Sequence, residues 1–221
     1  MNQQPEQILQ NMEYAIFDLD GTLLDSMPIW VNLGETVLKS LGIIPDEETT
    51  ERFRTMTLTQ SSYYIKEHFP IQISAEELLK IFTETVKKGY EEDAPLKPYA
   101  MDFLKLLKSK NIKMCVATAS ERHLSEAALK RTGVLPYLDF LITCSDIGKT
   151  KETPHIYLEA MKKLGGNLHN TVVFEDSLFS IRSAKKGGFS VIALYDECAT
   201  KEKETIKNTA DFYLESFSAL L

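Results

Sequence analysis

The sequence has few cysteines, no long apolar run and no surplus of positive charge. Its three cysteines, Cys115, Cys144 and Cys198, lie far apart and form no CxxC pair, which argues against a disulfide framework and against a zinc knuckle. No apolar stretch approaches the roughly 18 residues that a membrane-spanning helix needs. The segment MNQQPEQILQ lacks the positive and apolar regions of a signal peptide. We therefore expect a cytoplasmic protein.

The charge balance argues against two classes of partner. The 32 acidic residues outnumber the 25 basic ones, giving a formal net charge of −7. A general nucleic-acid binder, or a protein that docks on an acidic membrane, needs a basic face, so we expect neither partner. The 221 residues, 43% of them hydrophobic, allow one large domain or a medium domain that carries a smaller one. Nothing in the sequence indicates the oligomeric state.

Apolar periodicity divides the chain into three parts. A short strand is predicted over residues 14–17, and the following block, 28–93, is almost purely helical. In this block the capping-box pattern Ser74-Ala-Glu-Glu77 predicts the start of one helix. An earlier helix, with Gly42 as its stop, is predicted from apolar residues at helical spacing: Trp30, Leu33, Val37, Leu38 and Leu41. The stretch APLKP, residues 94–98, is a natural break.

After this break, strand patterns alternate with helix patterns. Strands are predicted over residues 112–117, 140–143, 171–174 and 191–194, with an edge strand over 211–214. Helices are predicted over 123–131 and 178–186, and a third begins with Thr153 as its cap. This alternation is typical of an α/β fold, a Rossmann-like parallel sheet with helices on both faces. The helical block is then an insertion after the first strand.

The stretch EYAIFDLDGTLLDS places two carboxylates, Asp18 and Asp20, at the end of the first predicted strand. Buried acids cost desolvation free energy unless a positive charge pairs with them. Asp20-Gly21 alone is also a common turn signal, but no strand pattern follows it, and a turn leaves Asp18 unexplained. The longer FDLDGTLLDS resembles the haloacid dehalogenase superfamily, whose first motif is a strand that ends in Asp-x-Asp-Gly-Thr.

The second and third motifs of that superfamily have counterparts further along the chain. Thr118 follows an apolar run in KMCVATAS, where the family has a Thr or Ser. In GKTKETPHIY, Lys151 stands three residues before a proline, as the family lysine does, with Lys149 as a close competitor. The chain departs from the common Lys-Pro-x-Pro-Asp form, because Glu152 and His155 stand where a proline and the aspartate are expected.

The fourth motif is an acidic pair after a strand, and Glu175-Asp176 in TVVFEDSLFSIRSAKKGG matches it. The resemblance covers nearly the whole chain. Within the superfamily, the chain resembles phosphatases with a helical cap inserted after the first motif, the phosphoglycolate phosphatase and beta-phosphoglucomutase-like group. It implies a Rossmann-like catalytic core formed by residues 1–26 and 97–221, and a small all-helical cap domain formed by residues 27–96.

The resemblance also implies a function, a Mg²⁺-dependent phosphohydrolase that acts on a small organic phosphate monoester through an aspartyl-phosphate. Asp18 is then the nucleophile, and Asp20 protonates the leaving alcohol and later takes a proton from water. Thr118 and Lys151 hold the phosphoryl oxygens. Mg²⁺ prefers oxygen ligands. The expected ligands are Asp18, Asp176 and the backbone carbonyl of Asp20, with Glu175 assisting.

Two other functions remain open. A sugar-phosphate mutase shares both aspartates of the first motif, but its members usually carry a histidine soon after it, where this chain has SMPIW at 26–30. A non-catalytic sensor of phosphorylated ligands has no need of the proton-transferring Asp20. Within the cap, Arg52, Arg54 and Tyr63 are candidates for substrate recognition.

Overall fold

The structure, a computed structural model, describes residues 9–53 and 56–221. The described chain divides into two compact units. One contains the residues up to Asp25 together with Pro95–Leu221, and it holds the sheet; the other is Ser26–Ala94, whose described part is built of helices. No described helix is both long and apolar enough to cross a membrane.

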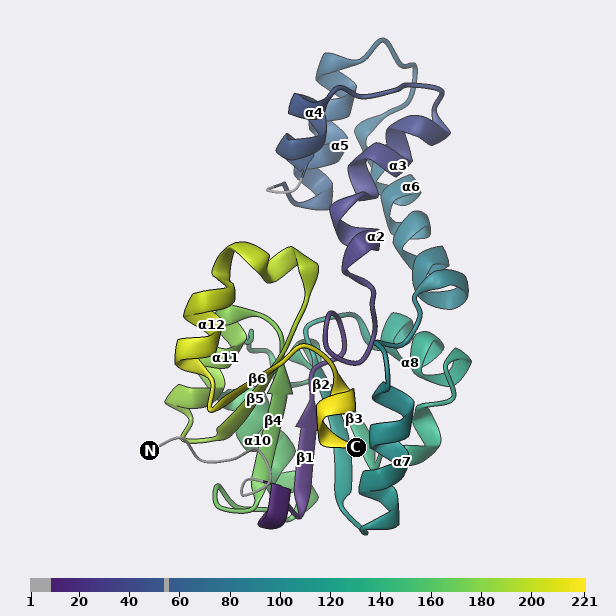
Figure 1. The fold of residues 1–221 in the computed structure, drawn as a ribbon. Helices are drawn as coiled ribbons and strands as arrows, with labels where there is room; N and C mark the ends of the chain where they lie inside the picture. The colour runs from purple at the N-terminus through teal and green to yellow at the C-terminus, as the bar shows by residue number, and fades with distance from the viewer. Residues whose placement is uncertain (1–8, 54–55) are drawn as a thin grey trace. The chain divides into compact units, whose positions relative to one another are not determined.

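The first unit is built on a six-stranded parallel sheet with the strand order β3-β2-β1-β4-β5-β6 (Figure 1). The strands are β1 (Tyr14–Phe17), β2 (Lys113–Thr118), β3 (Phe140–Thr143), β4 (Thr171–Glu175), β5 (Ser190–Leu194) and β6 (Phe212–Leu214). The central strands β1, β2 and β4 are short and almost wholly buried. The first strand therefore lies in the middle of the sheet, with later parts of the chain on both sides of it.

Helices cover this sheet on both of its faces. They are α7 (Ala100–Ser109), α8 (Arg122–Arg131), α9 (Cys144–Ile147), α10 (His155–Leu164), α11 (Leu178–Lys186) and α12 (Lys203–Thr209). Short 3₁₀ turns complete the unit at η2 (Leu135–Tyr137), η3 (Glu197–Glu202) and η4 (Phe217–Leu220). The predicted parallel sheet with helices on both faces is thereby confirmed.

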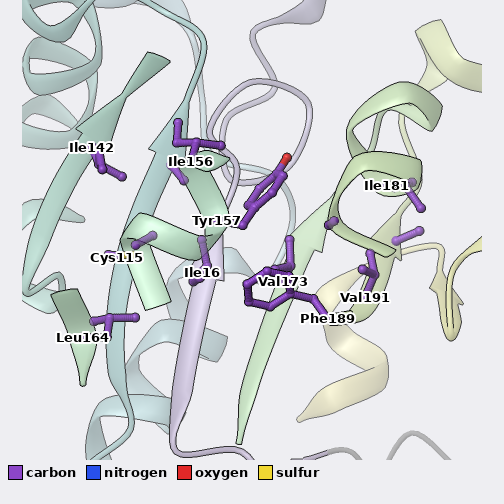
Figure 2. Close-up of a cluster of buried hydrophobic side chains, with 14 of the residues drawn as sticks. Ile16, Cys115, Ile142, Ile156, Tyr157, Leu164, Val173, Ile181, Phe189 and Val191 are labelled. Carbon is purple, nitrogen blue, oxygen red and sulfur yellow. The ribbon is translucent and has the colours of Figure 1, made fainter. Parts of the chain in front are cut away.

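Alternation along the strands separates two apolar layers, because successive side chains of a strand point to opposite faces. On one face Ile16 and Val173 pack with residues of α10 and α11 (Figure 2). On the other face the ring of Phe17 stacks on that of Phe174, with ring centroids 4.5 Å apart, and Phe103 of α7 meets Phe17 edge-on. Both faces of β1 are therefore covered, as a central parallel strand requires.

The described part of the second unit is built of helices. They are α2 (Met27–Val31), α3 (Leu33–Ser40), α4 (Glu47–Phe53), α5 (Leu58–His68) and α6 (Ala75–Lys88), with a π-helical turn η1 (Gly89–Asp93). The predicted capping box of α6 is present: the Ser74 hydroxyl accepts from the backbone N–H of Glu77, and the Glu77 side chain accepts from that of Ser74. Leu78, Phe82 and Val86 form its buried face.

Two elements differ from the sequence-based expectation. The single helix predicted around Trp30 is divided into α2 and α3, because Asn32 between them has a non-helical backbone (φ −97°, ψ 5°). Thr153 does not cap α10; Pro154 is the N-cap, and the Thr153 hydroxyl lies 2.9 Å from Nδ1 of His155. Proline fits this position because the first helical N–H groups lack intrahelical partners in any case.

The two segments that lead out of the sheet unit are bonded to each other before they leave it. The Asp25 N–H donates to the Pro95 carbonyl and the Lys97 N–H donates to the Leu23 carbonyl, both at 2.9 Å. Lys97 adds an ion pair to the buried Asp196, at 2.6 Å, and a longer one to Asp25, at 3.4 Å. These contacts fix both segments to the sheet unit.

Candidate active site

Three adjacent strands deliver polar side chains to one edge of the sheet. Asp18 directly follows β1, Thr118 ends β2, and Glu175 ends β4 with Asp176 directly behind it. The register aligns Phe17 with Val116 on one side and with Phe174 on the other, so these strand ends are level. Since ligands of open α/β sheets bind beyond the carboxyl ends of the strands, this edge is the candidate site.

Lys151 joins this group from the turn that precedes α10. Its ammonium donates to Asp18 Oδ1 and, at 2.6 Å, to Glu175 Oε1. The side chain is 3% exposed, so the ammonium is almost fully withdrawn from solvent. Lys149, the competitor in the sequence, is exposed. Of the two lysines, Lys151 is therefore the one that lies among the carboxylates.

Glu175 is engaged by hydrogen-bond donors on both of its oxygens. Oε1 accepts from Lys151 and also from the hydroxyl of Tyr157, at 2.7 Å. Oε2 accepts from the backbone N–H of Asp176, at 3.2 Å, and from the hydroxyl of Ser177, at 3.3 Å. The ring of Tyr157 belongs to the apolar cluster below, and its hydroxyl points away from Ile16 and Val173 (Figure 2). This buried carboxylate is thus held by the protein itself.

Asp176 packs against the turn that follows the first strand. Thr22 donates its hydroxyl to Asp176 Oδ1 at 3.1 Å. Gly21 has a φ of +83°, and a Cβ added there would lie 2.4 Å from Asp176 Oδ2. Glycine is needed twice here, once for the left-handed backbone and once for the close approach of this backbone to the carboxylate.

The side chain of Asp20 turns toward the loop after β2. Its Oδ2 accepts from the hydroxyl of Ser120 at 2.5 Å. The backbone N–H of the same serine donates to Oγ1 of Thr118 at 3.0 Å. Ser120 is therefore hydrogen-bonded both to Asp20 and to Thr118, the predicted phosphate-binding threonine.

Electrostatics show that this cluster has an excess of negative charge. Burial, together with repulsion from Glu175, raises the pKa of Asp18 to about 8, although Lys151 opposes the shift. Burial and repulsion from Glu175 and Asp18 raise the pKa of Asp176 well above its ordinary value. Burial disfavours the charge of Lys151, but its two carboxylate partners outweigh burial and raise its pKa well above 10.5.

The donor set fits a hard divalent cation. Asp18, Glu175 and Asp176 each offer one carboxylate oxygen, and these oxygens lie within 4.8 Å of one another. Three ionised carboxylates with one ammonium carry a formal charge of −2, which one divalent cation balances. Oxygen-only ligands favour Mg²⁺ or Ca²⁺ over softer metals.

The predicted recognition residues belong to the helical unit. Arg52, in α4, is paired with Glu48 one turn earlier, with 2.8 Å between Nη2 and Oε1. Tyr63, in α5, is 52% exposed. Arg54 lies outside the described residues.

Three polar residues of the site were not singled out from the sequence: Thr22, Ser120 and Tyr157. Thr22 and Ser120 stand inside quoted motifs, DGT and ATAS, two residues after Asp20 and Thr118 respectively, and this proximity in sequence was the available signal. Tyr157 lies on the buried face of α10, where a tyrosine at helical spacing indicates core packing. Its hydroxyl donates to Glu175, which lies 18 residues later in the chain at the end of β4, so the apolar pattern of α10 does not reveal this bond.

Comparisons with known proteins agree with this geometry. Residues 15–194 match the family described as Haloacid dehalogenase-like hydrolase. A phosphorylated carbohydrates phosphatase of Thermotoga maritima is 29% identical, over 82% of this chain and 84% of that protein. Hexitol phosphatase B of Escherichia coli K12 is 28% identical, over 82% and 81% of the two chains. The crystal structure of a "putative beta-phosphoglucomutase" from Thermotoga maritima is 26% identical, with a TM-score of 0.82, and covers 92% of this chain and 94% of its own.

Proposed function

The chain belongs to the haloacid dehalogenase-like hydrolase family, and on that premise we propose that it hydrolyses a small organic phosphate monoester through an aspartyl-phosphate intermediate. One observation carries the proposal: Asp18, Glu175 and Asp176 bring carboxylate oxygens within 4.8 Å of one another at the sheet edge, and the ammonium of Lys151 pairs with Asp18 and Glu175. The similarity to phosphatases of phosphorylated carbohydrates and hexitols supports a sugar or polyol phosphate as the substrate class.

In the first step a carboxylate oxygen of Asp18 attacks phosphorus. The new O–P bond forms while the ester P–O bond breaks, and Asp20 donates a proton to the departing oxygen. In the second step water attacks the phosphorus of the aspartyl-phosphate, and the Asp20 carboxylate takes the proton of that water. Asp18 is regenerated as inorganic phosphate leaves.

Lys151 and Thr118 hold the phosphoryl group in both steps. The ammonium of Lys151 is already in contact with Asp18, so it lies beside the atom on which the phosphoryl group arrives. The hydroxyl of Thr118 is wholly buried and accepts from the Ser120 N–H, which leaves its own proton for a phosphoryl oxygen. Donors that are fixed before the reaction stabilise the charge of the transition state without reorganising.

Mg²⁺ is the cofactor we assign to the site. Asp18, Asp176 and the backbone carbonyl of Asp20 would hold it. When bound, it neutralises the anionic phosphoryl group as the anionic nucleophile approaches. Because Glu175 accepts hydrogen bonds from Lys151, Tyr157 and the Asp176 N–H, we assign it mainly to holding Lys151, with an assisting role toward the ion.

A sugar-phosphate mutase is the second candidate, because the similar Thermotoga maritima structure is named for that activity. A mutase isomerises its substrate and a phosphatase releases phosphate, so a product assay with a sugar monophosphate separates them. The segment Ser26–Trp30 contains no histidine, which favours the phosphatase. A non-catalytic sensor remains a third and weaker candidate.

We assign substrate selection to the helical cap of residues 27–96, with Arg52 and Tyr63 as candidate contacts. A panel of sugar and polyol phosphates tests this assignment. Arg52→Ala and Tyr63→Ala should change the order of kcat/KM values across the panel. An unchanged order in both variants would contradict the assignment.

The proposed function is tested by phosphate release from p-nitrophenyl phosphate, with Mg²⁺ and with a chelator. Turnover should require the metal, and it should be lost in Asp18→Asn. Asp102→Asn serves as the matched control, because Asp102 is exposed on α7 of the same unit. Native-like turnover by Asp18→Asn, or full turnover in the chelator, would overturn the proposed mechanism.

A further inference from the structure

Asp20 has a partner that its proposed role does not explain. The carboxylate is partly exposed, unlike the buried Asp18 two residues earlier. Its Oδ2 accepts the hydroxyl of Ser120 at 2.5 Å, a contact between residues 100 positions apart in the chain. Hydrogen bonds to a carboxylate are shorter and stronger than those between neutral groups. The contact therefore restrains a side chain that would otherwise sample several rotamers.

We propose that Ser120 is a positioning residue that fixes Asp20 for proton transfer; this inference rests on the phosphohydrolase function proposed above. Ser120 holds the Oδ2 side of the carboxylate that moves the proton in the proposed mechanism. In the first step an O–H bond of Asp20 breaks and a new O–H bond forms on the leaving oxygen, while the ester P–O bond breaks. In the second step the Asp20 carboxylate takes a proton back from the attacking water, while the bond from Asp18 to phosphorus breaks.

The same loop also connects this proton donor to the phosphoryl site. Ser120 donates its backbone N–H to Thr118 Oγ1 at 3.0 Å, and its side chain donates to Asp20. Thr118 is the last residue of β2 and wholly buried, so the loop starts from a rigid point. Ser120 thus sets the position of the acid relative to the threonine that holds the phosphoryl oxygens. A proton donor is effective only when it lies within hydrogen-bond reach of the leaving atom.

A series of leaving groups provides the test. The substrates are phenyl, p-nitrophenyl and 2,4-dinitrophenyl phosphate. The leaving phenolate becomes less basic along this series, so its departure depends less and less on a proton donor. For Ser120→Ala we expect kcat/KM on phenyl phosphate to fall about tenfold to a hundredfold, which is part of the roughly 10²–10⁴-fold effect of a positioned acid. The loss on the dinitrophenyl ester should be at least about tenfold smaller than that on the phenyl ester. Ser120→Thr keeps a hydroxyl at this position and should recover most of the lost activity.

The controls separate this inference from the proposed function. Asp20→Asn should show the same dependence on leaving group, with a larger loss. An equal loss on all three esters, or no loss on phenyl phosphate, would overturn the positioning role of Ser120. Asp18→Asn that retains native turnover would instead overturn the proposed function. The melting temperatures of Ser120→Ala and Ser120→Thr, compared with that of the native chain, establish that each variant is folded.

Discussion

Replacing Lys151 by methionine removes the positive charge that pairs with two buried carboxylates, Asp18 and Glu175. Methionine has a similar length, so the main change is electrostatic. The ammonium pairs with Asp18 and with Glu175, and both of these side chains are at most 9% exposed. Breaking a buried ion pair by removing one partner costs about 3–5 kcal/mol, because the remaining charge is left uncompensated. We expect the loss in free energy of unfolding, measured in a chelator, to approach that amount as the pH rises above about 8, where Asp18 ionises.

The loss of stability should depend on pH and on metal. The pKa of Asp18 is already raised to about 8, and removal of Lys151 raises it further, so below about pH 8 a proton on Asp18 replaces the missing positive charge. The destabilisation should therefore be smaller in acid than in base. Added Mg²⁺ should recover part of the lost stability, since it binds the folded state and supplies charge to the same carboxylates.

Urea unfolding followed by circular dichroism measures the stability, and turnover of p-nitrophenyl phosphate with Mg²⁺ measures the activity. For Lys151→Met we expect kcat to fall at least about 10²–10³-fold, the usual cost of losing one fixed electrostatic donor. Lys149→Met is the matched control, and this exposed site should change stability by less than about 0.5 kcal/mol. Full activity in Lys151→Met together with a loss in Lys149→Met would refute the assignment of the phosphate-binding lysine.

Three further predictions concern neighbouring residues. Gly21→Ala should lower the free energy of unfolding by about 1–2 kcal/mol, because residue 21 has a positive φ. The added Cβ would lie 2.4 Å from Asp176 Oδ2, so the variant should also bind Mg²⁺ more weakly in calorimetry. Gly148→Ala, with φ +62° and no atom within 4 Å of the added Cβ, should destabilise similarly and leave Mg²⁺ binding unchanged. Tyr157→Phe leaves a buried carboxylate short of one donor, so the free energy of unfolding should fall by about 1–3 kcal/mol, and an unchanged urea midpoint would contradict this. In a chelator, the contribution of Asp18 to native stability should be fully present below about pH 3.8 and should be lost as the pH rises to about 8, because the folded state retains on Asp18 a proton that the unfolded chain releases near 3.8. Asp18→Asn should flatten this decline in urea titrations.

The sheet could be predicted from the sequence because its signals are local. Each central strand is a short apolar run, and the polar residues that end the runs, Asp18, Thr118 and Glu175, mark the functional edge. Parallel strands then bring these ends to one edge of the sheet, so residues distant in sequence could be expected to meet. The family inferred from the four motifs is confirmed by the match over residues 15–194.

The remaining parts of the site depend on tertiary contacts that leave no local pattern. A tyrosine on the apolar face of a helix has the same periodicity whether or not its hydroxyl has a partner, so the bond from Tyr157 to Glu175 could not be inferred. The contact from Ser120 to Asp20 depends on how the β2–α8 loop folds back toward β1. The division of the first predicted helix at Asn32 depends on one backbone conformation, which apolar spacing does not encode.

The paired segments around Leu24 and Leu96 have a consequence for how such a chain can change over evolutionary time. They form an antiparallel bridge, and their hydrogen bonds join Asp25 to Pro95 and Leu23 to Lys97. The two segments that flank residues 26–94 are therefore hydrogen-bonded to each other within the sheet unit. Residues 26–94 can then be lengthened, shortened or exchanged as one module, while the carboxylates and their lysine keep their supports. On the proposed role of these residues in substrate selection, replacing one continuous segment would change the substrate without altering the catalytic residues.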